Sequence, residues 1–419
     1  VARTSGQLRH LANVIDEGSF LEVTIDHARE STAPRLPDLR RMLIPLGPVA
    51  VFSASNFPFA FSVAGGDTAS AIAAGCSVVV KAHSGHPELS RLTTKIVTRA
   101  LDEAGAPHGL LSLVESTGAG VALVRHPVIR AVGFTGSLAG GRALFDLASS
   151  RPDPIPFFGE LGSINPVVIT PEADRARGTQ LAEGLAQSFQ LGAGQFCTKP
   201  GVVLVPRDSV IERAITDHVR ATDEALLTDR ISAGFADGVS AWQRAAGVDL
   251  IAGQASHEHG KARAMVFAVD AERLSTDADA LLTEVFGPTT LLVRYESVHD
   301  VPRLLELFEG SLTGTIHAEP GEEVSAITEV MVNRAGRVVF DGWPTGVAVT
   351  WSQHHGGPWP ATTSQFTSVG ATGIRRFQRP IAFQDAPEAQ LPVELWESNP
   401  LGIPRRIDGQ LVMAHESPE

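Results

Sequence analysis

Cys197 is the residue whose type and setting best fit nucleophilic chemistry. It lies in the segment Gly192-Ala193-Gly194-Gln195-Phe196-Cys197-Thr198, after a predicted helix. Glycines let the backbone approach a ligand closely, and a thiol presented there can attack an electrophile. A buried structural cysteine behind a glycine helix cap would give the same pattern. Cys76, the other cysteine, is interpreted as a small residue packed before a strand.

Two polar residues in apolar surroundings are candidates for the accompanying proton chemistry. Glu160 lies between glycines in Phe158-Gly159-Glu160-Leu161-Gly162. Desolvation there would raise the pKa of its carboxyl and make it a general base, whereas a solvated turn acid is the alternative. The side-chain amide of Asn56, in Ala54-Ser55-Asn56-Phe57-Pro58, could donate to an oxyanion. An asparagine before Phe-Pro is also common as a turn residue.

Two further segments could hold a phosphate or a ribose. Lys81 ends the run Val78-Val79-Val80, where its ammonium suits a ribose hydroxyl or a phosphate, unless it simply reaches solvent. Gly133-Phe134-Thr135-Gly136-Ser137 joins a predicted strand to a helix whose first N–H groups can hold a pyrophosphate. This turn differs from the usual Gly-x-Gly-x-x-Gly fingerprint and is a weak signal alone.

The pattern of histidines and cysteines indicates no metal site. Neither cysteine belongs to a His/Cys cluster with metal-ligand spacing, and the fourteen histidines form no His-Glu-x-x-His motif. We interpret His83, His86, His354 and His355 as polar surface or loop residues. The segment Gly162-Ser163-Ile164-Asn165 lacks the second glycine of a nucleophile elbow, which disfavours a Ser-His-Asp hydrolase.

Alternating strands and helices must position these residues. Strands are expected at Leu43–Phe52, Ser77–Lys81, Leu110–Val114, Ile129–Phe134, Pro166–Ile169 and Val202–Val205. Helices are expected at Gly6–Asp16, Gly66–Cys76, Pro87–Ala104, Arg175–Gly192 and Ser209–Leu227, with a further helix through Leu144. This alternation predicts an α/β fold with parallel sheets, whose carboxyl edges are where ligands bind. The polar residues 21 to 43 are expected to form a protruding hairpin.

Composition excludes several classes of partner. The chain of 419 residues has 34 Lys and Arg against 47 Asp and Glu, without the basic face that nucleic acid or an anionic membrane requires. No run of about 18 apolar residues and no signal-peptide pattern occurs, so we expect a cytoplasmic protein. Because the chain opens at Val1 inside a helical pattern, we expect part of the first domain to precede it in the complete protein.

Six segments, taken together and in order, resemble the aldehyde dehydrogenase superfamily. They are Ile44–Pro58 (IPLGPVAVFSASNFP), Val78–Pro87 (VVVKAHSGHP), Val132–Ser137 (VGFTGS), Glu160–Pro166 (ELGSINP), Gly194–Pro200 (GQFCTKP) and Thr283–Pro288 (TEVFGP). Further detail looks like the 2-oxoglutarate-semialdehyde (2,5-dioxovalerate) dehydrogenase branch. These segments are Phe59–Ala69 (FAFSVAGGDTA), Lys81–Pro87 (KAHSGHP), His355–Ser364 (HGGPWPATTS), Thr367–Pro380 (TSVGATGIRRFQRP) and Asp408-Gly409.

The resemblance implies a role for each candidate. Cys197 would be the nucleophile, Glu160 the general base, and Asn56 with the Cys197 N–H the oxyanion hole. The implied cofactor-binding residues are Lys81 for the adenosine ribose, Ser137 for a phosphate and Glu284 for the nicotinamide ribose, together with His83, Ser84, Gly133 and Phe286. Thiolate attack on an aldehyde, hydride loss to NADP or NAD and hydrolysis of the thioester would then need no metal.

The resemblance also implies an organisation. It comprises a Rossmann-like cofactor-binding domain of residues 1–20 and 44–160, an oligomerisation hairpin of 21–43, a catalytic domain of 161–350, and a C-terminal segment of 351–419 that wraps over a neighbouring domain or subunit. We expect a homodimer or homotetramer. Many family members carry a glutamate where this chain has Ser84, and that glutamate repels a 2′-phosphate, so NADP is plausible here.

Alternatives remain for the substrate and the reaction class. The expected substrate is an ω-oxo acid, 2-oxoglutarate semialdehyde, and the same-fold alternative is a medium- or long-chain aliphatic aldehyde. Arg142, Arg375 and Arg376 are candidates for binding a substrate carboxylate. A cysteine thioesterase or amidase would instead need a histidine beside Cys197 and no nicotinamide. A catalytically silent homologue is disfavoured by the intact Cys197, Glu160 and Asn56.

Overall fold

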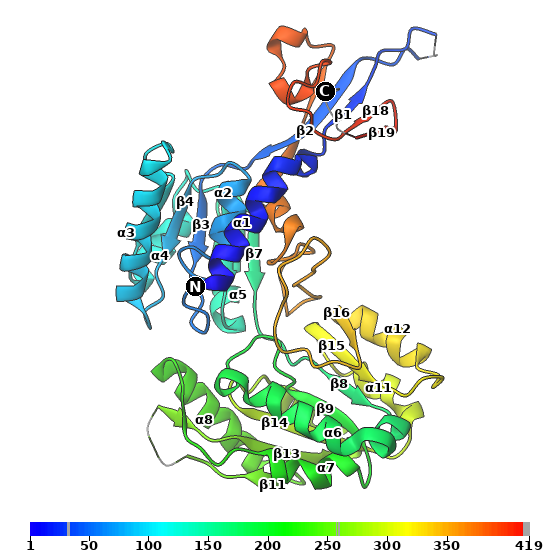
Figure 1. Ribbon diagram of the computed structural model, residues 1–419. Helices are drawn as coiled ribbons and strands as arrows, with labels where there is room; N and C mark the ends of the chain where they lie inside the picture. Colours follow the sequence, from blue (N-terminus) through cyan, green and yellow to red (C-terminus); the bar gives the residue numbers. More distant parts are fainter. Residues whose placement is uncertain (32–33, 257, 259, 414–419) are drawn as a thin grey trace.

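The computed structural model describes residues 1–31, 34–256, 258 and 260–413. Two large parallel sheets, each packed with helices, and a smaller mixed sheet make up the molecule (Figure 1). The α/β class expected from the alternating pattern is therefore confirmed. Among the described residues, no helix is long and apolar enough to cross a membrane.

The first sheet has five parallel strands in the order β5-β4-β3-β6-β7. The strands are β3 (Val49–Phe52), β4 (Val78–Lys81), β5 (Leu111–Val114), β6 (Ala131–Thr135) and β7 (Phe157–Glu160). The helices of this part are α1 (Ala2–Glu17), α2 (Gly66–Ala73), α3 (Pro87–Glu103), α4 (Thr117–Arg125) and α5 (Leu138–Ser149). Apolar runs such as Val49–Phe52 are buried along their length because parallel sheets are covered on both faces. The strand order reverses at β3, and such a switch point is where α/β sheets bind ligands.

The second sheet has seven strands in the order β11-β13-β14-β9-β8-β15-β16, parallel except at the β11 edge. The strands are β8 (Val167–Ile169), β9 (Val202–Pro206), β11 (Asp249–Gly253), β13 (Met265–Asp270), β14 (Thr289–Tyr295), β15 (Ser311–His317) and β16 (Ala335–Phe340). The helices are α6 (Pro171–Gln190), α7 (Val210–Ala214), α8 (Asp229–Arg244), α9 (Ala271–Thr276), α10 (Ala278–Leu281), α11 (Val301–Leu305) and α12 (Ser325–Arg334). Large apolar cores lie against this sheet.

The third sheet joins the early hairpin to the end of the chain. Its order is β17-β2-β1-β18-β19, made of β1 (Thr24–Asp26), β2 (Leu39–Pro45), β17 (Gln378–Gln384), β18 (Arg405–Ile407) and β19 (Gln410–Val412). It lies at the top of Figure 1, around a small core that includes Ile25, Met42 and Leu395. Residues 32–33 of the expected hairpin and 414–419 of the expected C-terminal segment lie outside the described residues.

Two expected elements differ in the structure. The run Leu43–Phe52 is interrupted because Gly47 has a φ of 118° and Pro48 follows it, so β2 ends at Pro45 and β3 begins at Val49. The helix expected at Ser209–Leu227 is wrong. Here α7 ends at Ala214, a 3₁₀ turn η3 covers Ile215–His218, and β10 (Glu224–Ala225) pairs with β12 (Lys261–Ala262).

Two buried side-chain amides explain why this helix stops. Gln190 accepts a hydrogen bond from the Arg220 N–H and donates to the His218 carbonyl. Gln195 accepts from the Leu227 N–H and donates to the Ala225 carbonyl. These long-range bonds take the backbone groups that a continuing helix would use, and local periodicity carries no sign of them.

Candidate active site

The carboxyl edge of the first sheet gathers residues from four strands. Lys81 is the last residue of β4 and Glu160 the last residue of β7, while Asn56 follows β3. Ser137 caps α5 directly after β6, with its hydroxyl accepting a hydrogen bond from the Gly140 N–H. Parallel pairing aligns these strand ends, with Glu160 opposite Thr135. The candidates scattered over more than a hundred residues of sequence therefore share one edge.

Cys197 follows a tight turn at the end of α6. Gly192, Ala193 and Gly194 all have left-handed backbone angles, with φ of 57°, 56° and 66°. A Cβ added to Gly194 would lie 2.2 Å from the carbonyl carbon of Gly287, so a glycine is required there. This close approach fixes the loop that presents the thiol.

Asn165 also anchors the loop that carries Cys197. Its amide nitrogen donates to the carbonyl oxygens of Cys197 at 2.8 Å and Lys199 at 2.9 Å, and its side-chain oxygen accepts from Ser163 and Thr313. Asn165 is fully buried, so each of these bonds is protected from water. The sequence analysis treats this segment as an incomplete hydrolase elbow and as part of the matching segment Glu160–Pro166, and neither indicates the anchoring role of Asn165.

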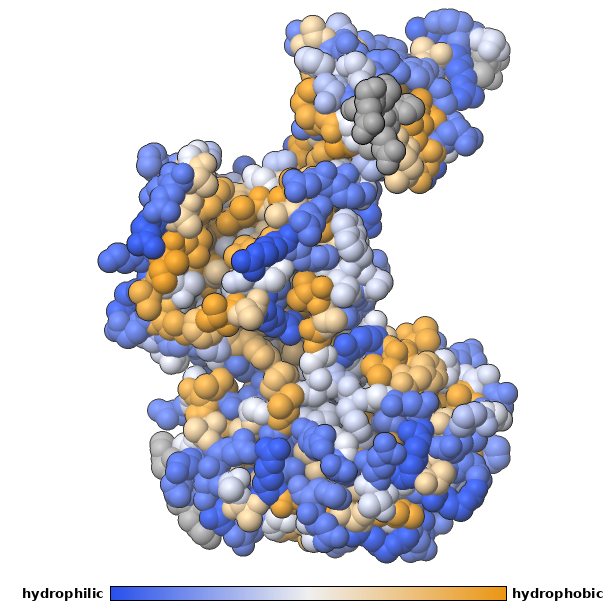
Figure 2. Space-filling model, viewed as in Figure 1, coloured by the Kyte–Doolittle hydropathy of each residue, from blue (hydrophilic) through white to orange (hydrophobic). Residues whose placement is uncertain are grey.

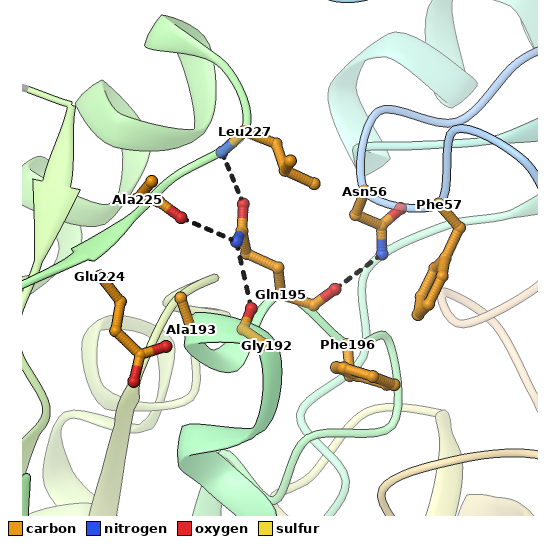
Figure 3. A pocket seen from close by; sticks show the side chains of 9 residues that line it. All are labelled: Asn56, Phe57, Gly192, Ala193, Gln195, Phe196, Glu224, Ala225 and Leu227. Atoms are coloured by element: carbon orange, nitrogen blue, oxygen red, sulfur yellow. Dashed lines mark hydrogen bonds between the residues drawn. The ribbon is translucent and has the colours of Figure 1, made fainter.

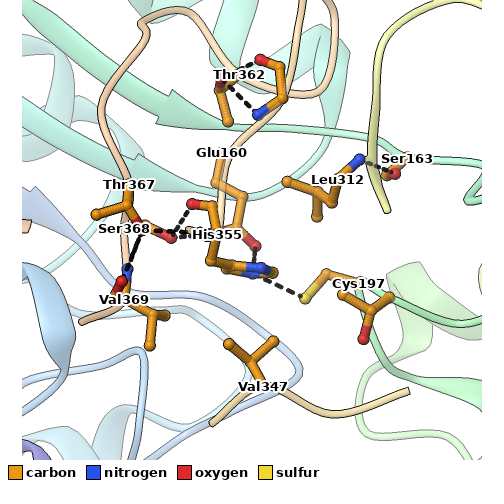
Figure 4. A network of polar contacts seen from close by, with 12 residues as sticks. Glu160, Ser163, Cys197, Leu312, Val347, His355, Thr362, Thr367, Ser368 and Val369 are labelled. Atoms are coloured by element: carbon orange, nitrogen blue, oxygen red, sulfur yellow. Dashed lines mark hydrogen bonds and ion pairs between the residues drawn. The ribbon is translucent and has the colours of Figure 1, made fainter. Parts of the chain in front are cut away.

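The side chains of Cys197, His355 and Glu160 lie close together (Figure 4). The Nε2 atom of His355 lies 3.5 Å from the Cys197 sulfur and 3.1 Å from Oε1 of Glu160. His355 is 1% exposed and Glu160 3% exposed, whereas Cys197 is partly accessible. His355 lies in a loop, as one part of the expectation has it, but it is buried and not at the surface. It is buried because the chain after β16 passes between the two large sheets.

The surrounding hydroxyls fix the orientation of this trio, by which we mean Cys197, Glu160 and His355. Ser368 donates to Oε2 of Glu160 at 2.6 Å. Thr367 accepts from the backbone N–H of His355 at 2.8 Å. Both oxygens of the Glu160 carboxylate are thus bonded, one by a hydroxyl and one by an imidazole, which holds the carboxylate in place.

The charges in the trio leave the thiol in need of a base. Burial, and then the neighbouring Glu160 carboxylate, raise the pKa of Cys197 well above its ordinary value. Burial alone would raise the pKa of Glu160 too, but the charge and hydrogen bond of His355, with that of Ser368, outweigh it and lower this pKa. Glu160 is therefore ionised at neutrality while the thiol keeps its proton. Nε2 of His355 donates to this ionised carboxylate and so already carries a proton, whereas the carboxylate also interacts with the Cys197 thiol and is placed to take the thiol proton.

The trio also has the donor set of a metal site. One ligand atom from each of the three residues lies within 4.8 Å of the others. The sequence spacing that indicated no metal could not detect this, since the three residues come from distant segments. A metal ion here would bind the nucleophile and the carboxylate together, and so would block the chemistry for which the same groups are suited.

Asn56 borders a cavity of about 420 Å³ beside the thiol loop (Figure 3). Its amide nitrogen donates one hydrogen bond, 3.0 Å long, to the carbonyl of Gln195. An amide nitrogen carries two N–H groups, so the second can donate to an oxyanion. Phe57 and Phe196 line the same cavity, with their ring centroids 5.0 Å apart.

The end of β4 presents a set of polar residues to the sheet edge. Burial lowers the pKa of Lys81, and lowers that of His83 to about 4 with help from the neighbouring His86 and Lys81, so His83 is neutral at pH 7. Nδ1 of His83 accepts from the Gly85 N–H, which leaves Nε2 to donate. The side chain of Ser84 is exposed.

The remaining cofactor candidates are spread more widely. Gly133 lies inside β6, where a Cβ would come within 3.0 Å of the Asp67 carboxylate, so it makes room for α2. Glu284 lies beside Gly162, and burial raises its pKa to about 7, opposed by the charge of Lys199. Phe286 follows two residues later and is half-buried.

The three arginines proposed for a substrate carboxylate are engaged elsewhere. Arg142 pairs with Asp146 on the surface of α5, and Arg375 pairs with Glu22. Arg376 is buried and donates to Asp67 at 2.7 Å. Each of the three already pairs with a carboxylate of this chain, although Nη2 of Arg376 has no partner among the described residues, so the three assignments stay predictions.

Comparison with known proteins agrees with this geometry. Residues 11–359 match the model of the aldehyde dehydrogenase family. The chain is 45% identical to alpha-ketoglutaric semialdehyde dehydrogenase 2 of Azospirillum brasilense, over 97% of this chain and 80% of that protein. It is 42% identical to the alpha-ketoglutaric semialdehyde dehydrogenase of Acinetobacter baylyi, over 98% of this chain and 80% of the relative.

Solved structures share the fold at much lower identity. The 1-pyrroline-5-carboxylate dehydrogenase from Thermus with bound NAD has a TM-score of 0.76 at 19% identity, over 91% of this chain and 73% of that one. Glyceraldehyde-3-phosphate dehydrogenase from Methanocaldococcus jannaschii complexed with NADP has a TM-score of 0.74 at 17% identity, over 91% and 80%. From the family match and the two relatives, the chain belongs to the aldehyde dehydrogenase family and is an oxidoreductase that acts on aldehydes with a nicotinamide cofactor.

Proposed function

We propose that this enzyme oxidises an ω-oxo acid, 2-oxoglutarate semialdehyde, to the corresponding dicarboxylic acid. The observation that carries the chemistry is the Cys197 thiol 3.5 Å from His355 Nε2, which in turn lies 3.1 Å from Glu160. The substrate assignment is supported by two relatives of that name at 42 and 45% identity over nearly the whole chain.

The carboxyl edge of the first sheet fits a nicotinamide dinucleotide. The N-terminus of α5, capped by Ser137, offers N–H groups to a phosphate, and Lys81 with the exposed Ser84 offers donors to a ribose. We assign this sheet to cofactor binding and the second sheet to catalysis. When bound there, the cofactor accepts the hydride that the substrate loses.

The residues of the trio act in two stages. Glu160 takes the thiol proton and passes it to solvent, and the Cys197 sulfur forms a bond to the aldehyde carbon, giving an oxyanion that Asn56 and the Cys197 N–H stabilise. Loss of hydride from that carbon leaves a thioester on Cys197. Glu160 then takes a proton from a water molecule, whose oxygen attacks the thioester, and returns it to the sulfur as the acid leaves and the thiol re-forms. Overall one aldehyde and one water give one acid, one hydride and one proton.

The cysteine thioesterase alternative had one requirement that the structure meets, because a histidine does lie beside Cys197. Its other requirement, the absence of nicotinamide chemistry, conflicts with membership of the aldehyde dehydrogenase family. His355, which donates to Glu160, is therefore a positioning residue for the base within a dehydrogenase. Acid release that depends strictly on added NADP or NAD would support this, and equal release without either cofactor would contradict it.

For the cofactor, we propose that NADP is used at least as efficiently as NAD. Ser84 carries no charge to repel a 2′-phosphate, its hydroxyl can donate to it, and Lys81 supplies a nearby cation. Following reduced cofactor with both dinucleotides and a panel of aldehydes tests substrate and cofactor together. The proposal predicts the highest kcat/KM with an ω-oxo acid and NADP, and a preference for long aliphatic aldehydes would contradict it.

We also propose that the enzyme is a homodimer or homotetramer. The third sheet projects from the body and ends in β19, where Leu411 and Met413 are exposed, and Figure 2 shows hydrophobic residues on this projection. On the first domain, Leu92 and Ile96 of α3 are more than half exposed. Light scattering on the purified chain should give two or four times the mass of 44.3 kDa, and a monomer would contradict the proposal.

A further inference from the structure

Arg3, at the start of α1, is a cation placed next to the trio. Its Nη1 donates to the Val347 carbonyl at 3.0 Å, and Val347 lies beside Cys197 and His355 (Figure 4). The guanidinium carbon is 5.6 Å from the centroid of the Phe61 ring, which is itself 6.4 Å from the His355 ring. Only one side chain therefore separates Arg3 from the imidazole.

The guanidinium of Arg3 has donor capacity that the described chain leaves unused. Nε donates to Gln7, but Nη2 is buried and has no hydrogen-bond partner among the described residues. Burying a guanidinium N–H without a partner costs free energy, so such a group is a strong candidate for a ligand contact. Burial lowers the pKa of Arg3, and the negative charges that oppose this are those of Cys197 and Glu160.

A second arginine, Arg337 on β16, serves as a comparison because it holds the same loop. Its Nη2 donates to the carbonyls of Pro344 at 2.7 Å and Gly346 at 3.2 Å. The Gly346 N–H in turn donates to Thr198, the residue after the nucleophile. Nε of Arg337 is also buried without a partner among the described residues, but two carbonyls occupy its Nη2, so it holds the loop at two points. Arg3 holds a single carbonyl of the loop.

Two neighbouring aromatic side chains, Phe57 and Phe61, lie between the cavity of Figure 3 and Arg3. Phe57 lines that cavity together with Phe196, and the ring of Phe57 is 5.6 Å from the ring of Phe61. Phe61 then contacts the guanidinium. In an extended five-carbon ω-oxo acid, four bonds of about 1.5 Å place the carboxylate carbon roughly 5 Å from the aldehyde carbon. That length suits a chain that starts at Cys197 and ends at a neighbouring cation.

We propose that Arg3 binds the carboxylate of the ω-oxo acid substrate through its free guanidinium nitrogen, while the aldehyde carbon lies at Cys197. This inference rests on the proposed function and names the residue that makes the site selective for an acid-bearing aldehyde. A carboxylate supplies the partner that Nη2 lacks, in a charge-assisted hydrogen bond. Because the contact is remote from the reacting carbon, its loss should weaken binding more than it slows chemistry.

The test compares two aldehydes of equal carbon number, 2-oxoglutarate semialdehyde and pentanal, on four proteins. These are the native enzyme, Arg3→Met, Arg3→Lys and the control Arg9→Met, which removes an exposed arginine of the same helix. In Arg3→Met, kcat/KM for the semialdehyde should fall by about 10- to 100-fold, mainly through KM, with pentanal little affected. Arg3→Lys should recover part of the loss, and Arg9→Met should behave as the native enzyme.

The possible outcomes separate this inference from the proposed function. If the native enzyme prefers the semialdehyde and Arg3→Met keeps that preference, the inference is overturned while the proposed function stands. Equal losses with both aldehydes would also overturn it, since they would show that Arg3 only supports α1. If the native enzyme does not prefer the semialdehyde to pentanal, the proposed substrate fails, and the carboxylate site fails with it.

Discussion

At the scale of single residues, the glycine-rich settings made Cys197 and Glu160 candidates, and the family resemblance gave them roles, but neither pointed to His355. His355 is 158 residues beyond Cys197, and nothing in its own segment marks it as catalytic. Its position depends on the path of the chain from β16 back towards α2, and on Thr367 and Ser368, which hold it there. Local motifs record residue type and spacing, whereas this contact is made only by the tertiary fold.

Replacing His355 should change the reactivity of the thiol in a pH-dependent way. Because the pKa of Cys197 is raised, the thiol is neutral at about pH 7 and needs the Glu160 carboxylate, which Nε2 of His355 holds in place, to remove its proton. In a Cys76→Ser background, His355→Leu, which removes the hydrogen bond to that carboxylate, should slow alkylation by iodoacetamide at least about tenfold near pH 7, and much less near pH 10, where hydroxide removes the proton. A rate that does not change at either pH would exclude a role of His355 in activating the thiol.

Replacing Glu160 should separate the two halves of the reaction. Because Glu160 interacts with the thiol and later activates water, Glu160→Gln should release hydride in a smaller first-turnover burst and then stop as a thioester. Mass spectrometry of the quenched variant would show the acyl group on Cys197, and Ser368→Ala serves as a control that removes only a hydrogen bond to the carboxylate. Steady turnover of Glu160→Gln at the native rate would remove this residue from the mechanism.

At the scale of elements, the strand that ends at Lys81 was predictable because a continuous apolar run marks a buried parallel strand. Lys81 lies at the end of β4 as that run indicates, whereas β7, which ends at Glu160, was not among the expected strands because Gly159 interrupts its short apolar run. The region 209–227 was not predictable, since the bonds from Gln190 and Gln195 that end the helix come from far along the chain. The spacing of apolar residues indicates which residues favour a helix. It does not indicate whether a distant side chain will take the backbone hydrogen bonds that the helix needs.

The loop after β4 should determine the choice of cofactor. Ser84→Glu places a carboxylate where a 2′-phosphate would lie, and even a partly screened repulsion costs about 1 kcal/mol or more. We expect the KM for NADP to rise about tenfold and the KM for NAD to change little. Ser84→Gln is the matched control, because it adds the same bulk without charge. Equal losses with both cofactors in Ser84→Glu would show that this loop does not contact the ribose.

The buried pair between Arg376 and Asp67 should contribute to stability and not to substrate choice. Arg376 joins the segment before β17 to the first turn of α2, and both side chains are buried. Removing one partner of a buried ion pair leaves the other uncompensated, so Arg376→Met should lower the free energy of unfolding by about 3–5 kcal/mol. The exposed neighbour Arg375, paired with Glu22, provides the control, with an expected loss of about 0–1 kcal/mol for Arg375→Met.

Denaturant unfolding of the two variants, together with their preference between an ω-oxo acid and an uncharged aldehyde, checks this assignment. The account predicts a large stability loss for Arg376→Met and an unchanged substrate preference in any folded fraction. A folded Arg376→Met of native stability that had lost the preference would contradict it.

At the scale of the whole molecule, the active site exists only where the two large sheets and the returning chain meet. Glu160 comes from the first sheet, Cys197 from the loop after α6, and His355 from the segment that follows β16. The alternation of strands and helices predicted the two sheets. The order in which they pack and the crossing of residues 355–369 between them depend on long-range contacts that a single sequence does not display.

The measurement that tests the account most directly follows reduced nicotinamide and carboxylic acid together, with 2-oxoglutarate semialdehyde as substrate, on the native enzyme, Cys197→Ser and Cys76→Ser. The account predicts one acid for each reduced cofactor in the native enzyme and in Cys76→Ser, whose thiol is buried away from the site. It predicts no product from Cys197→Ser, because a serine hydroxyl lacks the nucleophilicity of a thiolate. Product formation by Cys197→Ser at the native rate, or acid formed without reduced cofactor, would contradict it.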